Sequence, residues 1–168
     1  GFFEDTDFNH LNIELLQHLG LDWHTLFPLS DIEIDYLLAS HLKAQAVRLV
    51  HDKMEAAPIF GLKDPRTSLL LPFWISVFED CRIDVSYILA TRNPVSTIES
   101  LKKRNRFSSL KSTYLWLKYV IPALVLLRSH KTIAVEYERI LSNPKEQLYR
   151  IGNLIDLPRP DSSKLSAY

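Results

Sequence analysis

The sequence predicts an α/β domain built on a parallel sheet. Segments with helical periodicity alternate with short apolar segments that suit buried strands, and this alternation is typical of βαβ units. The apolar segments are nearly continuous rather than alternating, as expected for parallel strands that are covered by helices on both faces. The chain has 168 residues, 46% of them hydrophobic, which is enough for one domain with a substantial core. We therefore expect a single domain over residues 1–168.

The amino-terminal third is expected to be helical. Residues 6–19 place apolar side chains at helical spacing, with polar side chains at residues 5–7 able to cap the first turn and Gly20 placed to end the last. After a loop, the same spacing predicts one long helix over residues 30–55. This region is expected to contribute no strand to the sheet.

Three segments are predicted to be strands, and each is followed by a predicted helix. The strands are APIFGLK at residues 57–63, DVSYILAT at 84–91 and KTIAVEY at 131–137, which are apolar or rich in β-branched and aromatic residues. Prolines in the first turn and Asx caps set the starts of most following helices. The helices are expected from Pro72, from Pro94 to about Arg104, over residues 110–130 with a kink or division at Pro122, and over residues 143–157.

Composition excludes several classes of function. Twenty basic and twenty acidic residues cancel, so no global field attracts the chain to nucleic acid or to an anionic membrane. Cys81 is the only cysteine and the histidines show no ligand spacing, so we expect no metal site. No uninterrupted apolar run reaches the ~18 to 20 residues of a membrane span. One thiol and no export signal favour the cytoplasm, although a lumenal domain separated from its anchor would have the same composition.

Two of the predicted strands end in the same way. IFGLKDP and ILATRNP each run from an apolar strand into one basic residue, one Asx residue and a proline. In a parallel sheet both junctions lie at the carboxyl edge, where ligands bind in open α/β folds and where helix amino termini favour anions. Lys63 and Arg92 are therefore expected to point into one region that suits an anion.

The helix after Arg92 adds a polar stripe. At ~100° per residue, Ser96, Ser100 and Lys103 fall on one side of that helix. A phosphate held by Arg92 could accept hydrogen bonds from Ser96 or Ser100. The alternative is that Arg92 pairs with a surface carboxylate and that the serines form a solvated face.

These residues resemble the sulfotransferases that use 3′-phosphoadenosine 5′-phosphosulfate, in particular the bacterial type that modifies sugars and other small acceptors. In that family an arginine at a strand end and a serine eight positions later bind the 3′-phosphate, a spacing met by Arg92 and Ser100. GLKDPRTSLLLPFW resembles the family's strand-end lysine motif at Lys63, and EYERILSNP resembles a later motif whose tyrosine, here Tyr137, lies near the adenosine. GFFED at residues 1–5 resembles the segment after the family's phosphosulfate loop. The resemblance spans nearly all of residues 1–157.

The chain departs from the family at one motif. The family's first strand carries a loop with Ser-Gly-Thr that cradles the 5′-phosphosulfate, and such a loop depends on glycine. The chain's four glycines are not in that context: Gly1, Gly20, Gly61 and Gly152. We therefore expect a P-loop NTPase-like parallel sheet that is flanked by helices and missing its first strand. This would be a sulfotransferase-like domain incomplete at its amino terminus, or a degenerate homologue.

The resemblance assigns roles to the candidate residues. Arg92 and Ser100 would bind the 3′-phosphate, Ser96 would assist or only cap its helix, and Tyr137 would lie near the adenosine. Lys63 would contact the transferring sulfuryl group, or it is a strand-end lysine whose charge reaches solvent.

The base that accepts the acceptor's proton is expected to be an acidic residue. Glu4 stands near the position of an acidic base in related carbohydrate sulfotransferases, with Asp5 and Asp64 as rivals that also suit helix capping. Arg66 could join the anion site or pair with an acidic neighbour. Aromatic residues could line an acceptor pocket or belong to the core: Phe73, Trp74 and Trp116.

The predicted function is transfer of a sulfuryl group from 3′-phosphoadenosine 5′-phosphosulfate to a hydroxyl of a sugar or other small molecule, without a metal. Two alternatives remain. One is a non-catalytic module that binds adenosine bisphosphate or a protein partner. The other is a nucleotide-dependent phosphotransferase, which would require a Walker loop and an acidic magnesium ligand.

Overall fold

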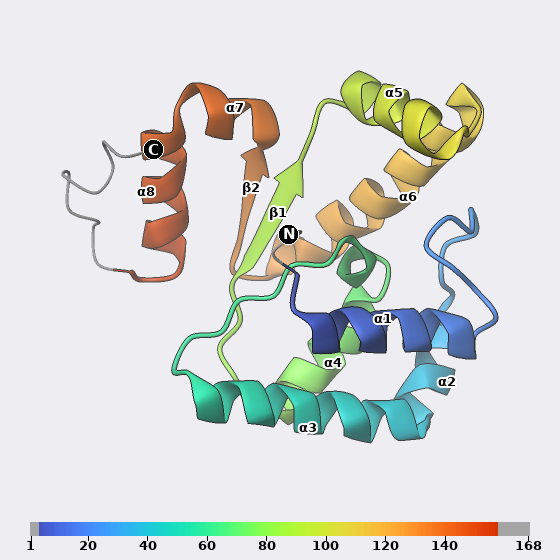
Figure 1. Ribbon diagram of the computed structural model, residues 1–168. Helices are drawn as coiled ribbons and strands as arrows, with labels where there is room; N and C mark the ends of the chain where they lie inside the picture. The colour runs from blue at the N-terminus through green and yellow to red at the C-terminus, as the bar shows by residue number, and fades with distance from the viewer. Residues whose placement is uncertain (1–3, 158–168) are drawn as a thin grey trace. The chain divides into compact units, whose positions relative to one another are not determined.

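Most of the described chain is helical, and its two strands form one small parallel sheet (Figure 1). The computed structural model describes residues 4–157. These residues form two compact units: the chain up to Asp84 together with Leu117–Ala123, and Val85–Trp116 together with the chain from Leu124 onward. The α/β class is therefore confirmed in a form with few strands.

The first unit is a helical cluster. Its helices are α1 (Thr6–His18), α2 (Asp31–Ala39), α3 (His41–Ala56), the short 3₁₀ helix η1 (Pro65–Ser68) and α4 (Leu71–Asp80). Phe8 of α1 lies against Trp74 of α4, with ring centroids 5.0 Å apart, and both side chains are fully buried. The predicted helix over residues 6–19 and the predicted helix near Pro72 are confirmed.

The predicted single helix over residues 30–55 is wrong, because the chain bends at Ser40. Ser40 adopts an extended conformation between α2 and α3. Its hydroxyl donates to the carbonyl of Leu37 at 2.7 Å and accepts from the amide of Leu42 at 3.2 Å. One serine therefore caps the end of one helix and the start of the next, and it compensates for the backbone hydrogen bonds lost at the break.

The predicted strand at residues 57–63 is also wrong. The segment has no regular structure, and the described residues pair no strand with it. Ile59 is exposed, and Phe60 instead stacks on Phe8 at a centroid distance of 5.3 Å. An apolar run becomes a strand only where a partner satisfies its backbone, so here the run forms an irregular connection that packs by its side chain. Lys63 consequently follows a loop rather than a strand.

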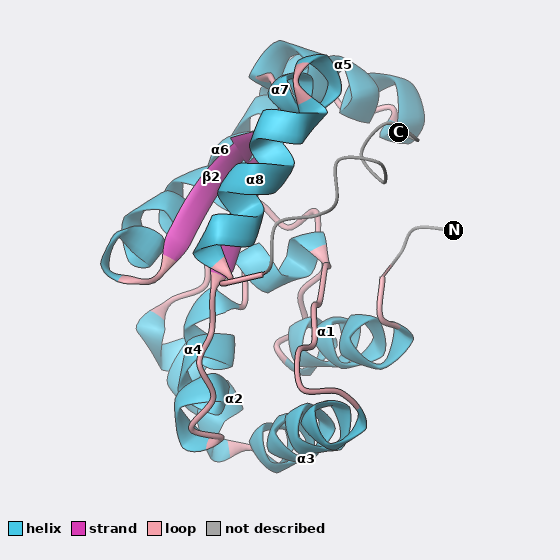
Figure 2. Cartoon of the chain, turned by 90° about the vertical axis from the view of Figure 1, so that its left-hand side faces the viewer, coloured by secondary structure: helices cyan, strands magenta, loops and turns pink. Residues whose placement is uncertain are grey.

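The second unit contains the sheet. Strands β1 (Tyr87–Thr91) and β2 (Thr132–Glu136) pair in parallel, with Tyr87 opposite Thr132 and Thr91 opposite Glu136. These strands confirm two of the three predicted, in shorter form. Figure 2 shows α8 beside β2, and the two elements are in contact.

Three helices of this unit begin within about one residue of their predicted starts: α5 (Pro94–Asn105), α6 (Ser109–Leu126) and α8 (Pro144–Leu154). Two short helices were not predicted as separate elements: η2 (Leu127–Ser129) and α7 (Tyr137–Ser142). α6 runs through Pro122 as one helix rather than two, and part of it belongs to the first unit. Tyr137, which was expected to end the strand, is instead the first residue of α7.

One helical stretch of the described chain, Ser109–Ser129, is apolar and long enough to cross a membrane by length and composition alone. Its mean hydropathy reaches 1.3, although its polar residues interrupt every continuous apolar run. Core helices of soluble proteins satisfy the same criterion, so the stretch is weak support for a membrane span.

A buried polar network connects α1 with the segment that leads into α4. Asn12 is fully buried; its side-chain oxygen accepts from the indole N–H of Trp74 at 2.8 Å, and its amide donates to Asp64 Oδ2 at 3.0 Å. The same amide lies 3.3 Å from the hydroxyl of Thr67. Arg66 donates to both carboxylate oxygens of Asp64, at 3.1 and 3.2 Å. Every partner in this network therefore depends on the others for its hydrogen bonds.

Replacing Asn12 by alanine is expected to lower the free energy of unfolding by about 2–4 kcal/mol, because it leaves the Trp74 N–H unpaired in the core and removes a donor to Asp64. Urea denaturation measures the change. Asn153→Ala, at an exposed position of α8, is the matched control and is expected to change stability by less than about 0.5 kcal/mol. Equal effects of the two substitutions would contradict the role of the network.

Candidate functional site

The strongest candidate site lies at the carboxyl edge of the sheet. Arg92 directly follows β1 and Tyr137 directly follows β2, and the last residues of the two strands are paired in register. The guanidinium carbon of Arg92 lies 5.1 Å from the centroid of the Tyr137 ring, which places the cation over the aromatic face. The sequence prediction that Arg92 lies at a strand end is confirmed. The family resemblance assigns Tyr137 to the nucleotide site, but the sequence does not predict that its ring stacks with Arg92.

The first turn of α5 adds few free donors to this edge. The side-chain oxygen of Asn93 accepts from the amides of Val95 at 2.9 Å and Ser96 at 3.4 Å, which caps the helix. The amide of Asn93 itself donates to Glu138 Oε1 at 3.2 Å. An anion at this edge would therefore rely on side chains more than on the helix amides.

The side chains available for that task are Arg92 and the serines of α5. Arg92 is exposed and, within residues 4–157, forms no ion pair. Ser96 and Ser100 lie one turn apart on α5, and in the described structure neither hydroxyl is engaged in a hydrogen bond. A guanidinium with two hydroxyls on the adjoining helix can bind a phosphate or sulfate group.

A second candidate feature lies in the first unit, where the structure brings Lys63 and Glu4 together. Lys63 Nζ lies 2.7 Å from Glu4 Oε1, and the side-chain amide of Asn9 donates to the other oxygen, Oε2, at 2.9 Å. Glu4 is largely covered, whereas the Lys63 side chain is 61% exposed. The two residues are 59 positions apart, so no periodicity or short motif could have indicated this pair.

Lys63 belongs to the first unit and Arg92 to the second. Their expected convergence on one anion-binding region therefore remains a prediction. Lys63 does not lie at a strand end, because residues 57–64 form a loop.

Asp5, a rival base, is a helix cap. Its Oδ1 accepts from the amides of Asp7 at 3.0 Å and Phe8 at 3.2 Å, and its Oδ2 pairs with Lys53 at 2.8 Å. Burial alone would raise the pKa of the Asp5 carboxyl, but the Lys53 hydrogen bond and the helix amides outweigh burial and lower this pKa. A lowered pKa is opposite to what a general base requires.

Asp64, the other rival, serves structure as well. It is buried, it caps η1 by accepting from the amide of Arg66 at 2.9 Å, and it belongs to the network around Asn12. Arg66 is thus paired with an acidic neighbour, one of the two alternatives left open by the sequence. The capping interpretation is confirmed for both aspartates.

The aromatic residues that could line an acceptor pocket belong mostly to the core. Phe73 and Trp74 are both 0% exposed, and Trp74 is hydrogen-bonded to Asn12. Trp116 on α6 is half-buried. Neither buried ring can contact an acceptor without a rearrangement of the core.

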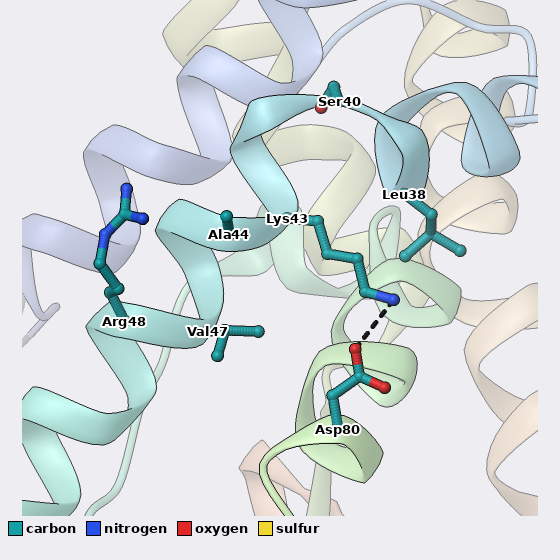
Figure 3. A pocket seen from close by; sticks show the side chains of 7 residues that line it. All are labelled: Leu38, Ser40, Lys43, Ala44, Val47, Arg48 and Asp80. Carbon is teal, nitrogen blue, oxygen red and sulfur yellow. Dashed lines mark ion pairs between the residues drawn. The ribbon is translucent and has the colours of Figure 1, made fainter.

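An open hollow of about 510 Å³ lies elsewhere on the first unit (Figure 3). Across it Lys43 of α3 pairs with Asp80 of α4 at 2.8 Å. The hollow includes none of the residues that the sequence singled out; it is lined by Leu38, Ser40, Lys43, Ala44, Val47, Arg48 and Asp80. Lys43 and Asp80 neutralise each other, so the charge that the lining keeps is that of Arg48, which is exposed and forms no ion pair within residues 4–157.

Comparisons of the chain with protein-family models, with curated proteins and with solved structures found no match. Within residues 4–157 there is also no group of three or more His, Cys, Asp or Glu side chains that could hold a metal ion.

Asp5→Asn is expected to reduce the loss of stability in acid. Because the folded-state pKa of Asp5 is below its ordinary value of 3.8, its charge stabilises the fold above pH 3.8, and this contribution is lost as pH falls through the lowered value. Asparagine keeps the cap but removes the titration. Unfolding free energies measured from pH 7 to pH 2 should fall less steeply below pH 3.8 in the variant. The exposed Asp35→Asn is the control, and an identical acid profile in Asp5→Asn and the original chain would contradict the assignment.

Proposed function

We propose that the chain is a sulfotransferase domain that takes its sulfuryl group from 3′-phosphoadenosine 5′-phosphosulfate. The observation that supports this proposal most is the stacking of Arg92 on Tyr137 at the carboxyl edge of two parallel strands, the edge where α/β folds bind nucleotides. The same two residues carry two of the family-like motifs in the sequence. We also propose that the complete domain has a P-loop NTPase-like fold and that the protein is cytoplasmic.

The second unit is proposed to bind the nucleotide. Arg92 would bind the 3′-phosphate through two parallel hydrogen bonds, with Ser100 and Ser96 donating from α5. Tyr137 is 46% exposed, so its ring retains surface on which an adenine can stack beside the guanidinium. Cation and ring together would distinguish an adenosine bisphosphate from a free phosphate.

The transfer step is assigned to residues of the first unit by their motifs. Glu4 would accept the proton of the acceptor hydroxyl, so that the acceptor oxygen forms the new bond to sulfur. The bond between sulfur and the bridging phosphate oxygen breaks, and Lys63 would stabilise the charge that develops on the leaving side. The 2.7 Å pair between Lys63 and Glu4 supports a shared role for this cation and this carboxylate. To accept the proton, a Glu4 oxygen would first be released by Lys63 or by the Asn9 amide. The acceptor is proposed to be a sugar or another small hydroxyl compound.

Arg92→Ala is expected to weaken binding of adenosine 3′,5′-bisphosphate by roughly 10- to 100-fold, because it removes a charge-assisted, bidentate contact to the 3′-phosphate. Isothermal titration calorimetry measures the dissociation constant. Arg128→Ala is the matched control, since Arg128 is an exposed arginine that precedes β2 and so lies toward the amino end of the strands. Adenosine 5′-monophosphate is the control ligand and should bind weakly to the original chain and to both variants.

The results separate the proposal from its alternative. Binding that needs Arg92 and the 3′-phosphate, together with transfer of labelled sulfate to a hydroxyl acceptor, would support the enzyme. Binding without transfer would favour a non-catalytic nucleotide-binding module. Equal affinities of Arg92→Ala and Arg128→Ala would contradict the assignment of the phosphate site.

A further inference from the structure

Charge is distributed very unevenly along this chain. Residues 100–135 contain no aspartate or glutamate, but they contain eight basic residues: Lys102, Lys103, Arg104, Arg106, Lys111, Lys118, Arg128 and Lys131. The chain as a whole has 20 basic and 20 acidic residues, so the remainder has 12 basic and 20 acidic. The neutral total therefore conceals a strongly positive segment.

Four of these cations gather around the turn from α5 to α6, and we call Lys103, Arg104, Arg106 and Lys111 the basic cluster. Lys103, Arg104 and Arg106 are exposed at the end of α5 and just after it, and Lys111 lies in the first turn of α6. Figure 1 shows α5 and α6 on the two sides of this turn. Across the part of the chain that the structure describes, none of the four forms an ion pair with a carboxylate, whereas their neighbour Lys102 pairs with Glu99 at 2.8 Å. The charge of the cluster thus remains available to a partner.

The exposed side of α6 is apolar. Its exposed large side chains are, for the most part, hydrophobic, and we call them the apolar stripe: Leu110, Tyr114, Ile121, Leu124 and Val125. At ~100° per residue all five lie within about 60° of Leu110, so they share one side of a single helix. Leu110 is 67% exposed and Val125 is 63% exposed. The helix has no acidic residue, and the basic cluster adjoins its first turn.

The opposite side of α6 is packed against the protein. Leu115 and Ala123 are buried, and the ammonium of Lys118 donates to the carbonyl of Thr25 at 2.6 Å. The hydroxyl of Tyr119 donates to the carbonyl of Trp23 at 2.7 Å. These contacts hold the helix in the fold, so α6 can present its exposed side to a surface but cannot cross a bilayer while they persist.

The basic cluster and the apolar stripe together indicate which kind of partner binds this surface. An apolar helix side can enter the boundary between lipid headgroups and acyl chains, while neighbouring lysines and arginines bind anionic headgroups. Nucleic acid would satisfy the basic cluster but would leave the apolar stripe in water. A second copy of this segment would cover the stripe but could offer no carboxylate to the cluster. An anionic bilayer satisfies both features.

We propose that the basic cluster and the apolar stripe form a surface that binds the interface of anionic lipid membranes, with α6 lying along the membrane plane. This surface does not depend on the sulfotransferase proposal, because it includes none of the residues proposed to bind the nucleotide: Arg92, Ser96, Ser100 and Tyr137. The neutral charge of the whole chain predicts no attraction to an anionic membrane, but the positive charge of residues 100–135 favours such binding locally.

Flotation with lipid vesicles tests the surface. The chain is expected to float with vesicles of phosphatidylcholine and phosphatidylserine at a 7:3 ratio, to float much less with pure phosphatidylcholine, and to lose binding as salt rises. The triple variant Lys103→Gln, Arg104→Gln and Lys111→Gln should lower the partition coefficient about 100-fold, from the usual contribution of each cation near an anionic surface. The matched control removes the same charge elsewhere: Arg48→Gln, Arg139→Gln and Lys145→Gln, all at exposed positions.

A second variant tests the apolar stripe. Leu110→Ser with Val125→Ser keeps every charge and should lower binding to the mixed vesicles at least about 10-fold, because apolar area no longer enters the interface. Circular dichroism must show the original helix content in each variant. Absence of binding to mixed vesicles, equal binding to pure phosphatidylcholine, or an equal loss in the control triple would overturn the proposal. So would binding that single-stranded RNA abolishes while the serine variant keeps full affinity, since the surface would then be a nucleic-acid site.

Discussion

The parallel pairing of β1 with β2 is the constraint on which the second unit depends. Parallel strands cannot be joined by a hairpin, so the chain must cross from the end of one strand back to the start of the next. Here α5 and α6 supply that connection, and the register sets Thr91 opposite Glu136. The residues that follow, Arg92 and Tyr137, are therefore brought to one edge. A slip of one position in either strand would turn that strand's side chains to the opposite face of the sheet and would separate this pair.

Local signals in the sequence predicted most of the helices. Asn93 and Asn143 each precede a proline, and in the structure they cap α5 and α8 as a cap followed by a first-turn proline should. Asp5 likewise caps α1. These features depend on neighbours within four residues, which is why sequence alone suffices for them. The same local pattern placed Arg92 correctly at the end of β1.

The wrong predictions, a single helix over residues 30–55 and a strand at residues 57–63, concern features that no local sequence pattern indicates. Helical periodicity continues on both sides of Ser40 because α2 and α3 both contribute to the core of the first unit, so periodicity alone does not reveal the break. Residues 57–63 have the composition of a strand but lack the partner that a strand needs. The pair between Glu4 and Lys63, like the stacking of Arg92 on Tyr137, joins positions far apart in the chain. For the candidate site, the sequence could therefore nominate residues but not say which of them meet.

The hydroxyl of Ser40 has a consequence for the dynamics of the first unit. Helix ends normally fray, opening one turn at a time at little cost. Because this one oxygen accepts from the amide of Leu42 and donates to the carbonyl of Leu37, the end of α2 and the start of α3 are closed by the same group. Fraying at either helix end breaks the cap of the other. The corner is thus a cooperative joint, and amide protons on its two sides exchange with solvent through one shared opening rather than two.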